Sequence, residues 1–177
     1  MKKRSVVRLI LVLALVLVNI SCDQVSKEAV RDRISENEYI HVIEDMFILT
    51  KVENVGAAMS LGSGLSPGLK TVILKILPLC LILVMFVVVL VRKEMSQWST
   101  IGWAFIIGGG IGNIYDRLLY DSVTDFMYID LGAGFHTGIF NMADVSVVVG
   151  TLLVVSQVIL DRKKKKETVS TQQEDTV

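Results

Sequence analysis

Four long apolar blocks dominate the sequence, and the charged residues crowd into the segments between them. The blocks span about residues 5–22, 69–91, 98–115 and 139–160. Each approaches or exceeds the roughly 20 residues that a helix needs to cross the hydrocarbon core of a bilayer. Because lipid offers the backbone no hydrogen-bond partners, the crossing segments have to be helices. We therefore predict a membrane α-helical protein with four transmembrane helices.

The basic residues indicate how the chain is inserted. They cluster before the first block, after the second and after the fourth, at Lys2, Lys3, Arg4, Arg8, Arg92, Lys93, Arg162 and Lys163–Lys166. With four crossings these clusters fall on one side, which the positive-inside rule assigns to the cytoplasm. Both termini are then cytoplasmic, and the segments 28–68 and 117–138 lie outside. We predict a four-span domain over 1–162 and a cytoplasmic tail over 163–177 that is basic and then disordered, because its end is polar and lacks aromatic residues.

The outer segments contain strand-like runs. Residues near 46–53 and 57–61 are rich in Ile, Val, Phe and Thr and flank a turn at Asn54–Gly56. Alternation over 123–129 favours another strand. Together these runs predict a small extracytoplasmic β-sheet at the outer membrane surface.

The first block has a second interpretation as a signal sequence. Its basic start, apolar core and "SC" ending are typical of a lipoprotein signal cleaved before Cys22. Asn19, however, stands where such a signal would carry Leu or a similar residue. The three further blocks also argue against an anchored soluble product, so we expect the first block to remain as a span.

Polar residues recur at the predicted outer ends of the helices. They lie in the motifs DQVSK (Asp23 and Lys27), NVGAA (Asn54 and Gly56), GNIYDR (Asn113, Asp116 and Arg117), TDF (Asp125) and FNMAD (Asn141 and Asp144). Within the helical motifs, spacings of three and four residues put these groups on a shared helix face. The clusters therefore converge on one level of the bundle. Ionisable groups at membrane depth are costly and by default mark a functional site.

Several of these residues also fit purely structural roles. Asp23 with Lys27 could be an interfacial ion pair, and Asp116 with Arg117 could tie the third helix to a neighbour. The run GGGIGN, residues 108–113, lies in an apolar span and fits close helix packing better than a phosphate loop.

Asp125 and Asp144 are different, because neither has an obvious local basic partner. Two neighbouring carboxylates share one proton, since both cannot ionise comfortably. The ionised member can activate water while the protonated one polarises a peptide carbonyl. The sequence thus raises the hypothesis of an aspartic-protease pair, although spacing alone does not establish that the two residues meet.

The motifs DQVSK, NVGAAMS, GGGIGNIYDR, VTDF and FNMAD, in this order across four spans, resemble those of signal peptidase II, the bacterial lipoprotein signal peptidase family. The resemblance covers roughly residues 8–160. It implies an intramembrane aspartyl endopeptidase with four helices and a small outer sheet. Such an enzyme removes signal peptides from prolipoproteins and cuts before a cysteine that carries diacylglycerol.

The resemblance also implies residue roles and partners. The catalytic pair would be Asp125 and Asp144, and the supporting or substrate-binding residues would be Asp23, Lys27, Asn54, Gly56, Asn113, Asp116, Arg117 and Asn141. The expected partners are diacylglyceryl-modified prolipoproteins and membrane lipid, with no nucleic acid, no metal and no cofactor. We expect a monomer in the cytoplasmic (inner) membrane with its site at the outer face. Ser26, Met59 and Gly138–Ile139 depart from residues common in the family and touch only the rim of the expected site.

Two other functional classes stay open at this point. A transporter or proton-coupled channel also uses acids within the membrane. The sequence shows no acids deeper in the second and third blocks and no repeated halves, which such proteins often have. A non-catalytic assembly factor or lipid-binding module would tolerate replacement of Asp125 and Asp144.

Overall fold

The computed structural model describes residues 3–36, 38–56, 64–92 and 94–174 of the 177-residue chain. Its helices are α1 (Lys3–Arg33), α2 (Pro67–Thr71), the π-helical turn η2 (Val72–Ile76), α3 (Leu77–Val91), α4 (Gln97–Leu119) and α5 (Met142–Glu174). Its strands are β1 (Ile40–Ile43), β2 (Phe47–Asn54) and β3 (Val123–Ile129). The described part of the chain is thus mostly helical, with one small sheet.

Three helical stretches in the described part of the chain are long and apolar enough to cross a membrane. They span Val6–Arg33, Pro67–Val91 and Met142–Lys164, which confirms three of the four predicted spans. The α4 helix, at 23 residues, is long enough but does not reach the same hydropathy. Its glycines and its polar residues lower the mean hydropathy, so the count of four transmembrane helices is not established by composition.

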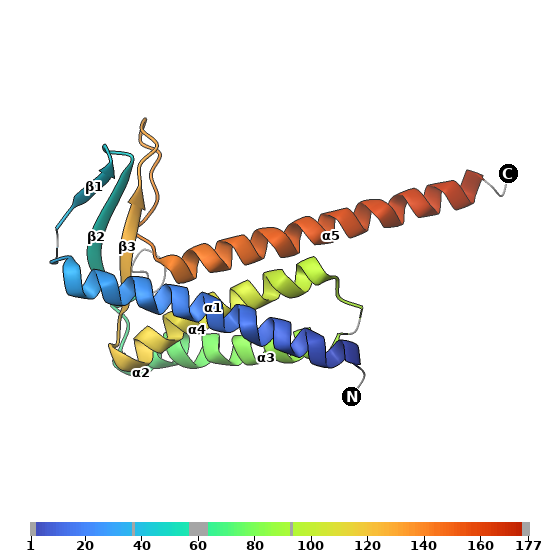
Figure 1. Cartoon of the computed structure of the whole chain (residues 1–177), viewed down its shortest axis with the longest axis horizontal. Helices are drawn as coiled ribbons and strands as arrows, with labels where there is room; N and C mark the ends of the chain where they lie inside the picture. Colours follow the sequence, from blue (N-terminus) through green and yellow to red (C-terminus); the bar gives the residue numbers. More distant parts are fainter. Residues whose placement is uncertain (1–2, 37, 57–63, 93, 175–177) are drawn as a thin grey trace.

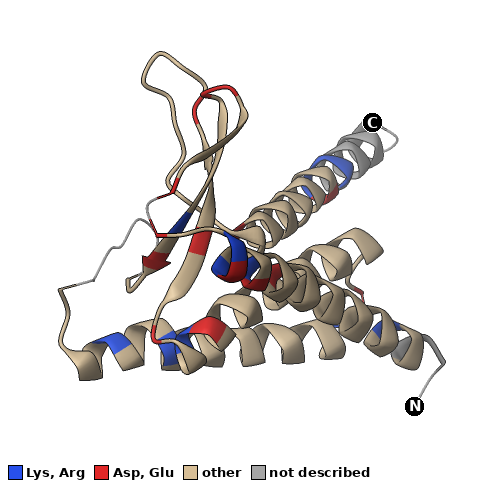
Figure 2. Ribbon diagram, turned by 60° about the vertical axis from the view of Figure 1, so that its left-hand side comes forward, with Lys and Arg blue, Asp and Glu red and all other residues tan. Residues whose placement is uncertain are grey.

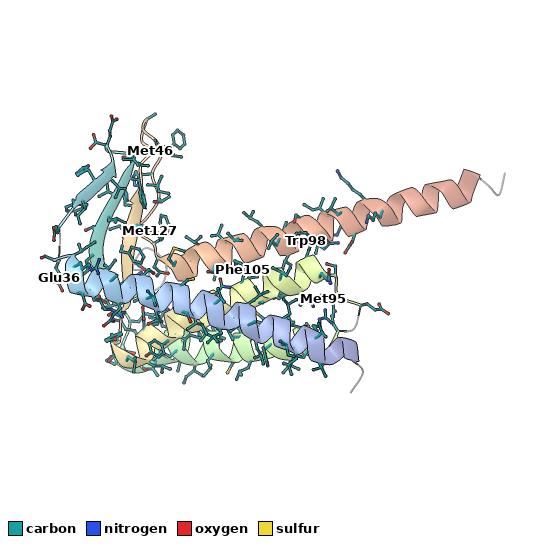
Figure 3. All side chains as sticks on the ribbon, in the orientation of Figure 1. Glu36, Met46, Met95, Trp98, Phe105 and Met127 are labelled. Atoms are coloured by element: carbon teal, nitrogen blue, oxygen red, sulfur yellow. The ribbon has the colours of Figure 1, made fainter. Side chains whose placement is uncertain are left out.

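The long helices run alongside one another, with the sheet at one end (Figure 1). The start of α1 and the far end of α5 lie at the opposite end. Met46 and Met127 mark the sheet, whereas Met95 and Trp98 lie at the far end of the bundle (Figure 3). The α4 helix contacts α1, α3 and α5 and is the central helix of the bundle.

Glycines allow α4 to pack closely against its neighbours. A Cβ atom on Gly109 would collide with the carbonyl oxygen of Ala143, and one on Gly108 would lie 2.7 Å from the Asn19 side chain. Gly102 and Gly150 face one another across the same α4–α5 contact. The prediction that GGGIGN forms a helix-packing surface is therefore confirmed.

The sheet is antiparallel, with the strand order β1–β2–β3. Strands β2 and β3 confirm the predictions near 46–53 and over 123–129. The strand predicted near 57–61 falls outside the described residues. The sequence prediction missed β1, because it is only four residues long and lies in a charged segment. Buried Val30, Ile34 and Phe126 join the sheet to the end of α1.

Two helices extend beyond the predicted blocks. The α1 helix continues through DQVSK to Arg33, so Asp23 and Lys27 lie within a continuous helix. The α5 helix continues to Glu174, so the described part of the tail that we predicted for 163–177 is helical and not disordered; its last three residues fall outside the described residues. Lys, Arg and Glu are good helix formers, and neither Gly nor Pro interrupts residues 23–33 or the segment after Gly150, which explains both extensions.

Candidate active site

The polar start of α5 is a reciprocal cap. The side-chain oxygen of Asn141 accepts a hydrogen bond from the backbone N–H of Asp144 at 3.0 Å. In return, the Asp144 carboxylate accepts one from the backbone N–H of Asn141 at 3.1 Å. This is the arrangement of a capping box, with Asp in place of the usual Glu or Gln. It explains why an apolar helix begins with two polar residues three positions apart.

The side chain of Asn141 also reaches Asp125 on β3. Its amide nitrogen donates to one carboxylate oxygen of Asp125 at 2.6 Å, and the amide of Asn54 on β2 donates to the other at 2.9 Å. Asn141 therefore contacts both acids, through its side chain to Asp125 and through its backbone to Asp144. The fold therefore brings Asp125 of β3 and Asp144 of α5 to the same residue, Asn141.

The environment of Asp125 favours its protonated form. The residue is only 4% exposed, and burial raises the pKa of its carboxyl group to about 6. The nearby negative charge of Asp144 adds to this rise in pKa, whereas the hydrogen bonds from Asn54 and Asn141 and the charge of Lys27 oppose it.

A buried ion cluster lies beneath the two acids. The ammonium group of Lys27 is 2.8 Å from an Asp23 oxygen and 2.9 Å from an Asp116 oxygen, and all three side chains are fully buried. Asp23 also accepts a hydrogen bond from the backbone N–H of Ala143 at 2.9 Å, which ties α1 to the first turn of α5. A carboxylate is stabilised at a helix N-terminus. The predicted Asp23–Lys27 pair thus forms, but inside the protein.

Asn113 connects this ion cluster to Asp144. Its amide nitrogen donates to the Asp144 carboxylate at 2.9 Å. Its oxygen accepts from the ammonium group of Lys27 at 3.0 Å and from the amide of Asn141 at 3.2 Å. Asn113 therefore uses both ends of its amide to link three helices.

Arg117 and Gly56 hold the turn that follows β2. The guanidinium of Arg117 donates to the carbonyl oxygen of Gly56 at 3.0 Å and to that of Asn113 at 3.3 Å. The backbone N–H of Gly56 donates to the Asn54 side chain at 3.0 Å, which orients the amide that contacts Asp125. Asp116 and Arg117 therefore tie α4 to different neighbours: Arg117 contacts the turn after β2, and Asp116 contacts Lys27 on α1.

Every site residue predicted from the sequence belongs to this one contact network. Charged residues gather where the sheet meets the helix ends, whereas most of the helix length carries no charge (Figure 2). Sequence reasoning missed Gln24 and Arg31, both of which contact Asp116. Arg31 lies four residues after Lys27, so the helical spacing that linked Asp23 to Lys27 could have found it. The described residues contain no cluster of His, Cys, Asp and Glu suited to a metal ion.

The family model described as signal peptidase (SPase) II matches residues 15–160. The chain belongs to the signal peptidase II family. A lipoprotein signal peptidase of Clostridium acetobutylicum is 32% identical over 150 residues, covering 85% of this chain and 94% of the relative. One of Neisseria gonorrhoeae is 36% identical over 154 residues, covering 87% and 92%.

A solved bacterial membrane enzyme has the same fold, with a TM-score of 0.77 and 24% identity over 88% of this chain and 92% of that one. A second such structure gives a TM-score of 0.72 at 22% identity. Membership in the signal peptidase II family makes this chain a peptidase, and its apolar helices make it a membrane protein.

Proposed function

We propose that the chain is an aspartic endopeptidase that removes the signal peptide from prolipoproteins. In this proposal it cuts on the amino side of a cysteine that carries diacylglycerol, and Asp125 and Asp144 activate the attacking water. The observation that carries the proposal is the pair of contacts from Asn141, which donates to one acid through its side chain and to the other through its backbone.

The chemistry follows from a carboxylate pair that holds one proton. The ionised member takes a proton from water while the water oxygen attacks the carbonyl carbon of the scissile bond. The protonated member donates to the carbonyl oxygen. When the tetrahedral intermediate collapses, a proton passes to the leaving amine and the C–N bond breaks. A pKa of about 6 for Asp125 supports a proton that is available near neutral pH.

The amide side chains keep both carboxylates in place for this reaction. Each oxygen of Asp125 accepts one amide N–H, and each oxygen of Asp144 accepts one N–H from Asn113 or Asn141. Donors fixed before the substrate arrives need not reorganise during the reaction. Because these donors are neutral amides, they orient the acids without a full positive charge in contact with either one.

The proposal includes a fourth membrane crossing by α4. Strands β2 and β3 pair in one sheet, and the span Pro67–Val91 leads away from that sheet (Figure 1). The chain must return before β3, and α4 is the segment that returns. Four crossings put the sheet and the acids at the outer face of the cytoplasmic membrane and both termini in the cytoplasm, in agreement with the positive-inside rule.

This placement explains why acids lie at the membrane edge. A lipid-modified cysteine keeps its acyl chains in the bilayer, so the bond before it also lies near the membrane surface. The signal helix of the substrate would lie beside the spans, whose apolar side chains face outward; Leu17 and Val25 on α1, for example, are 65% and 69% exposed.

Cleavage by the purified protein tests this proposal. We expect it to cut a diacylglyceryl-modified precursor and to leave a product that begins with the modified cysteine. Asp125→Asn and Asp144→Asn should each abolish cleavage while the proteins stay folded. Asp121→Asn is the matched control, because Asp121 lies in the turn before β3 but is 88% exposed, and it should retain activity. Cleavage by either site variant, or none by the parent protein, would refute the proposal.

A further inference from the structure

Arg31 is a charged residue of this region to which the proposed mechanism gives no role. We propose that Arg31 is a positioning residue that holds β3, the strand of Asp125, against the ion cluster that supports Asp144. This inference rests on the proposed function, because positioning matters only if the two acids act together.

The guanidinium of Arg31 contacts two different elements, β3 and α4, at the same time. Its Nε donates to the hydroxyl of Thr124 on β3 at 2.9 Å, and its Nη2 is 3.2 Å from a carboxylate oxygen of Asp116 on α4. Its central carbon lies 4.2 Å from the ring centroid of Tyr120, so the planar group also stacks on that ring. The remaining carboxylate, that of Glu28, is 3.6 Å away and 63% exposed. The rigid fork of Arg suits such a site, whereas Lys offers one point charge.

Thr124 and Asp125 point to opposite faces of β3, because successive residues of a strand alternate. Both are buried, at 0% and 4% exposure. On one face, Asn54 and Asn141 hold Asp125. On the other face, Thr124 accepts from Arg31 and donates to Glu53 on β2 at 2.8 Å. The strand is therefore held from both sides at the position of the acid.

The same contacts continue to the second acid. Asp144 contacts Asn113 at 2.9 Å, and Asn113 contacts Lys27 at 3.0 Å. Lys27 is 2.9 Å from Asp116, which is 3.2 Å from Arg31. Arg31 contacts Thr124 at 2.9 Å. Asp125 and Asp144 are thus joined by two routes, a short one through Asn141 and a longer one that passes through Arg31. The first route ends at the carboxylate of Asp125, and the second ends at the hydroxyl of Thr124, the preceding residue of β3.

Loss of the second route should affect the reaction more than substrate binding. A displacement of about 1 Å of a reacting group can cost on the order of a hundredfold in rate. The contacts described for Arg31 are with Thr124, Asp116, Glu28 and Tyr120, and they include neither acid. Its removal is therefore expected to lower kcat and to leave KM nearly unchanged.

The test compares Arg31→Met and Thr124→Val with two controls, Arg33→Met and Thr124→Ser. Arg33 is an exposed arginine on the same helix, and Ser keeps the hydroxyl. We expect Arg31→Met and Thr124→Val each to lower kcat by about tenfold or more, with KM within about twofold of the parent value. Arg31→Lys should stay impaired, and Thr124→Ser should be close to the parent. The double variant should be no slower than the worse single variant, because either single change already breaks the contact between Arg31 and Thr124.

Hydrogen–deuterium exchange at residues 123–129 gives a reading that does not need activity. Exchange should be faster in Arg31→Met and Thr124→Val and unchanged in Arg33→Met. A parent protein that fails to cleave would refute the proposed function, while the exchange data would still test the link to β3. The inference is overturned by unchanged exchange, by a rise in KM with normal kcat, or by variants that lose only thermal stability.

Discussion

At the scale of residues, the site places neutral amides next to the acids and moves the positive charges further away. Asn54, Asn113 and Asn141 contact Asp125 and Asp144. The ammonium group of Lys27 is neutralised in its own cluster by Asp23 and Asp116. A cation in direct contact would favour the ionised form of Asp125 and lower its pKa. Amide donors fix the geometry and still allow the pair to keep a proton.

The pH profile should respond to Asn54 in a defined direction. The rate requires the one-proton state of the pair, so kcat/KM should be bell-shaped, with its alkaline limb near the pKa of about 6 of Asp125. Asn54 donates to the ionised form of Asp125 and thereby lowers its pKa. Asn54→Ala should raise this pKa, by about one unit for a hydrogen bond to a charged group. The alkaline limb then moves to higher pH.

The measurement is kcat/KM of purified parent, Asn54→Ala and Arg33→Met across acid and alkaline pH. Arg33→Met should leave both limbs in place. A limb that stays fixed or moves to lower pH in Asn54→Ala would contradict the role given to Asn54.

Lys27 should matter chiefly for stability. Lys27→Met leaves Asp23 buried without its cation and leaves Asp116 with Arg31 as its cation, and breaking a buried pair costs about 3–5 kcal/mol. Thermal unfolding in detergent measures the loss. Lys163→Met, which removes an exposed lysine of α5, should have almost no effect. Adding Asp23→Asn to Lys27→Met should recover part of the stability, and a double variant less stable than Lys27→Met alone would argue against charge as the cause.

At the scale of elements, the site depends on how closely α4 approaches α1 and α5. Gly112 lies where a Cβ atom would be 2.5 Å from a carboxylate oxygen of Asp23, and Gly109 lies against the backbone of Ala143. These contacts bring Asp23 to the first turn of α5 and Asn113 to Asp144. The glycines that let α4 pack closely therefore also position the polar side chains of the site.

Two neighbouring glycines should respond differently to substitution by Ala. In Gly109→Ala the new Cβ meets the backbone oxygen of Ala143, which cannot move aside, so we expect a loss of about 1–3 kcal/mol. In Gly110→Ala it meets the end of the Ile82 side chain, which can rotate, and helix propensity favours Ala. Melting temperatures of the two variants provide the comparison. Equal values would mean that backbone contact does not limit the approach of α5.

The sequence predicted some of these elements well and others only in part. Apolar length identified three spans, and alternation identified β2 and β3, because both patterns are local. The hydropathy of α4 understates its role, because the glycines that let it pack centrally are not strongly apolar. The contacts of Asp116 were only partly predicted, because Asp116 lies on α4 and its partners lie on α1. Residue spacing within one helix does not show how two helices cross, and the crossing decides which side chains meet.

At the scale of the whole molecule, the fold separates two ends. The sheet and the acids lie at one end of the bundle, and the start of α1 and the far end of α5 lie at the other (Figure 1). Sequence charge predicted this polarity, since Arg8 on α1, Arg92 after α3 and Arg162 on α5 belong to the segments that lie away from the sheet. The convergence of the predicted site residues was also foreseen, but the partner of each amide was not, because it depends on three-dimensional packing.

Cysteine labelling tests the crossing by α4. Glu94 and Phe135 are exposed and lie in the loops before α4 and after β3. In a background with Cys22 and Cys80 replaced by Ser, Phe135→Cys should react with an impermeant maleimide in spheroplasts. Glu94→Cys should react only after the membrane is permeabilised. Labelling of both positions from the same side would rule out a crossing between them.

The central claim is that Asp125 and Asp144 work as one catalytic unit, and single-turnover cleavage by Asp125→Asn, Asp144→Asn and the double variant tests it most directly. We predict that each single change costs at least about a thousandfold and that the double variant is no slower than the worse single one, because residues that act as a unit are not additive. Folded single variants that keep more than a tenth of the parent rate, or losses that multiply in the double variant, would contradict the account.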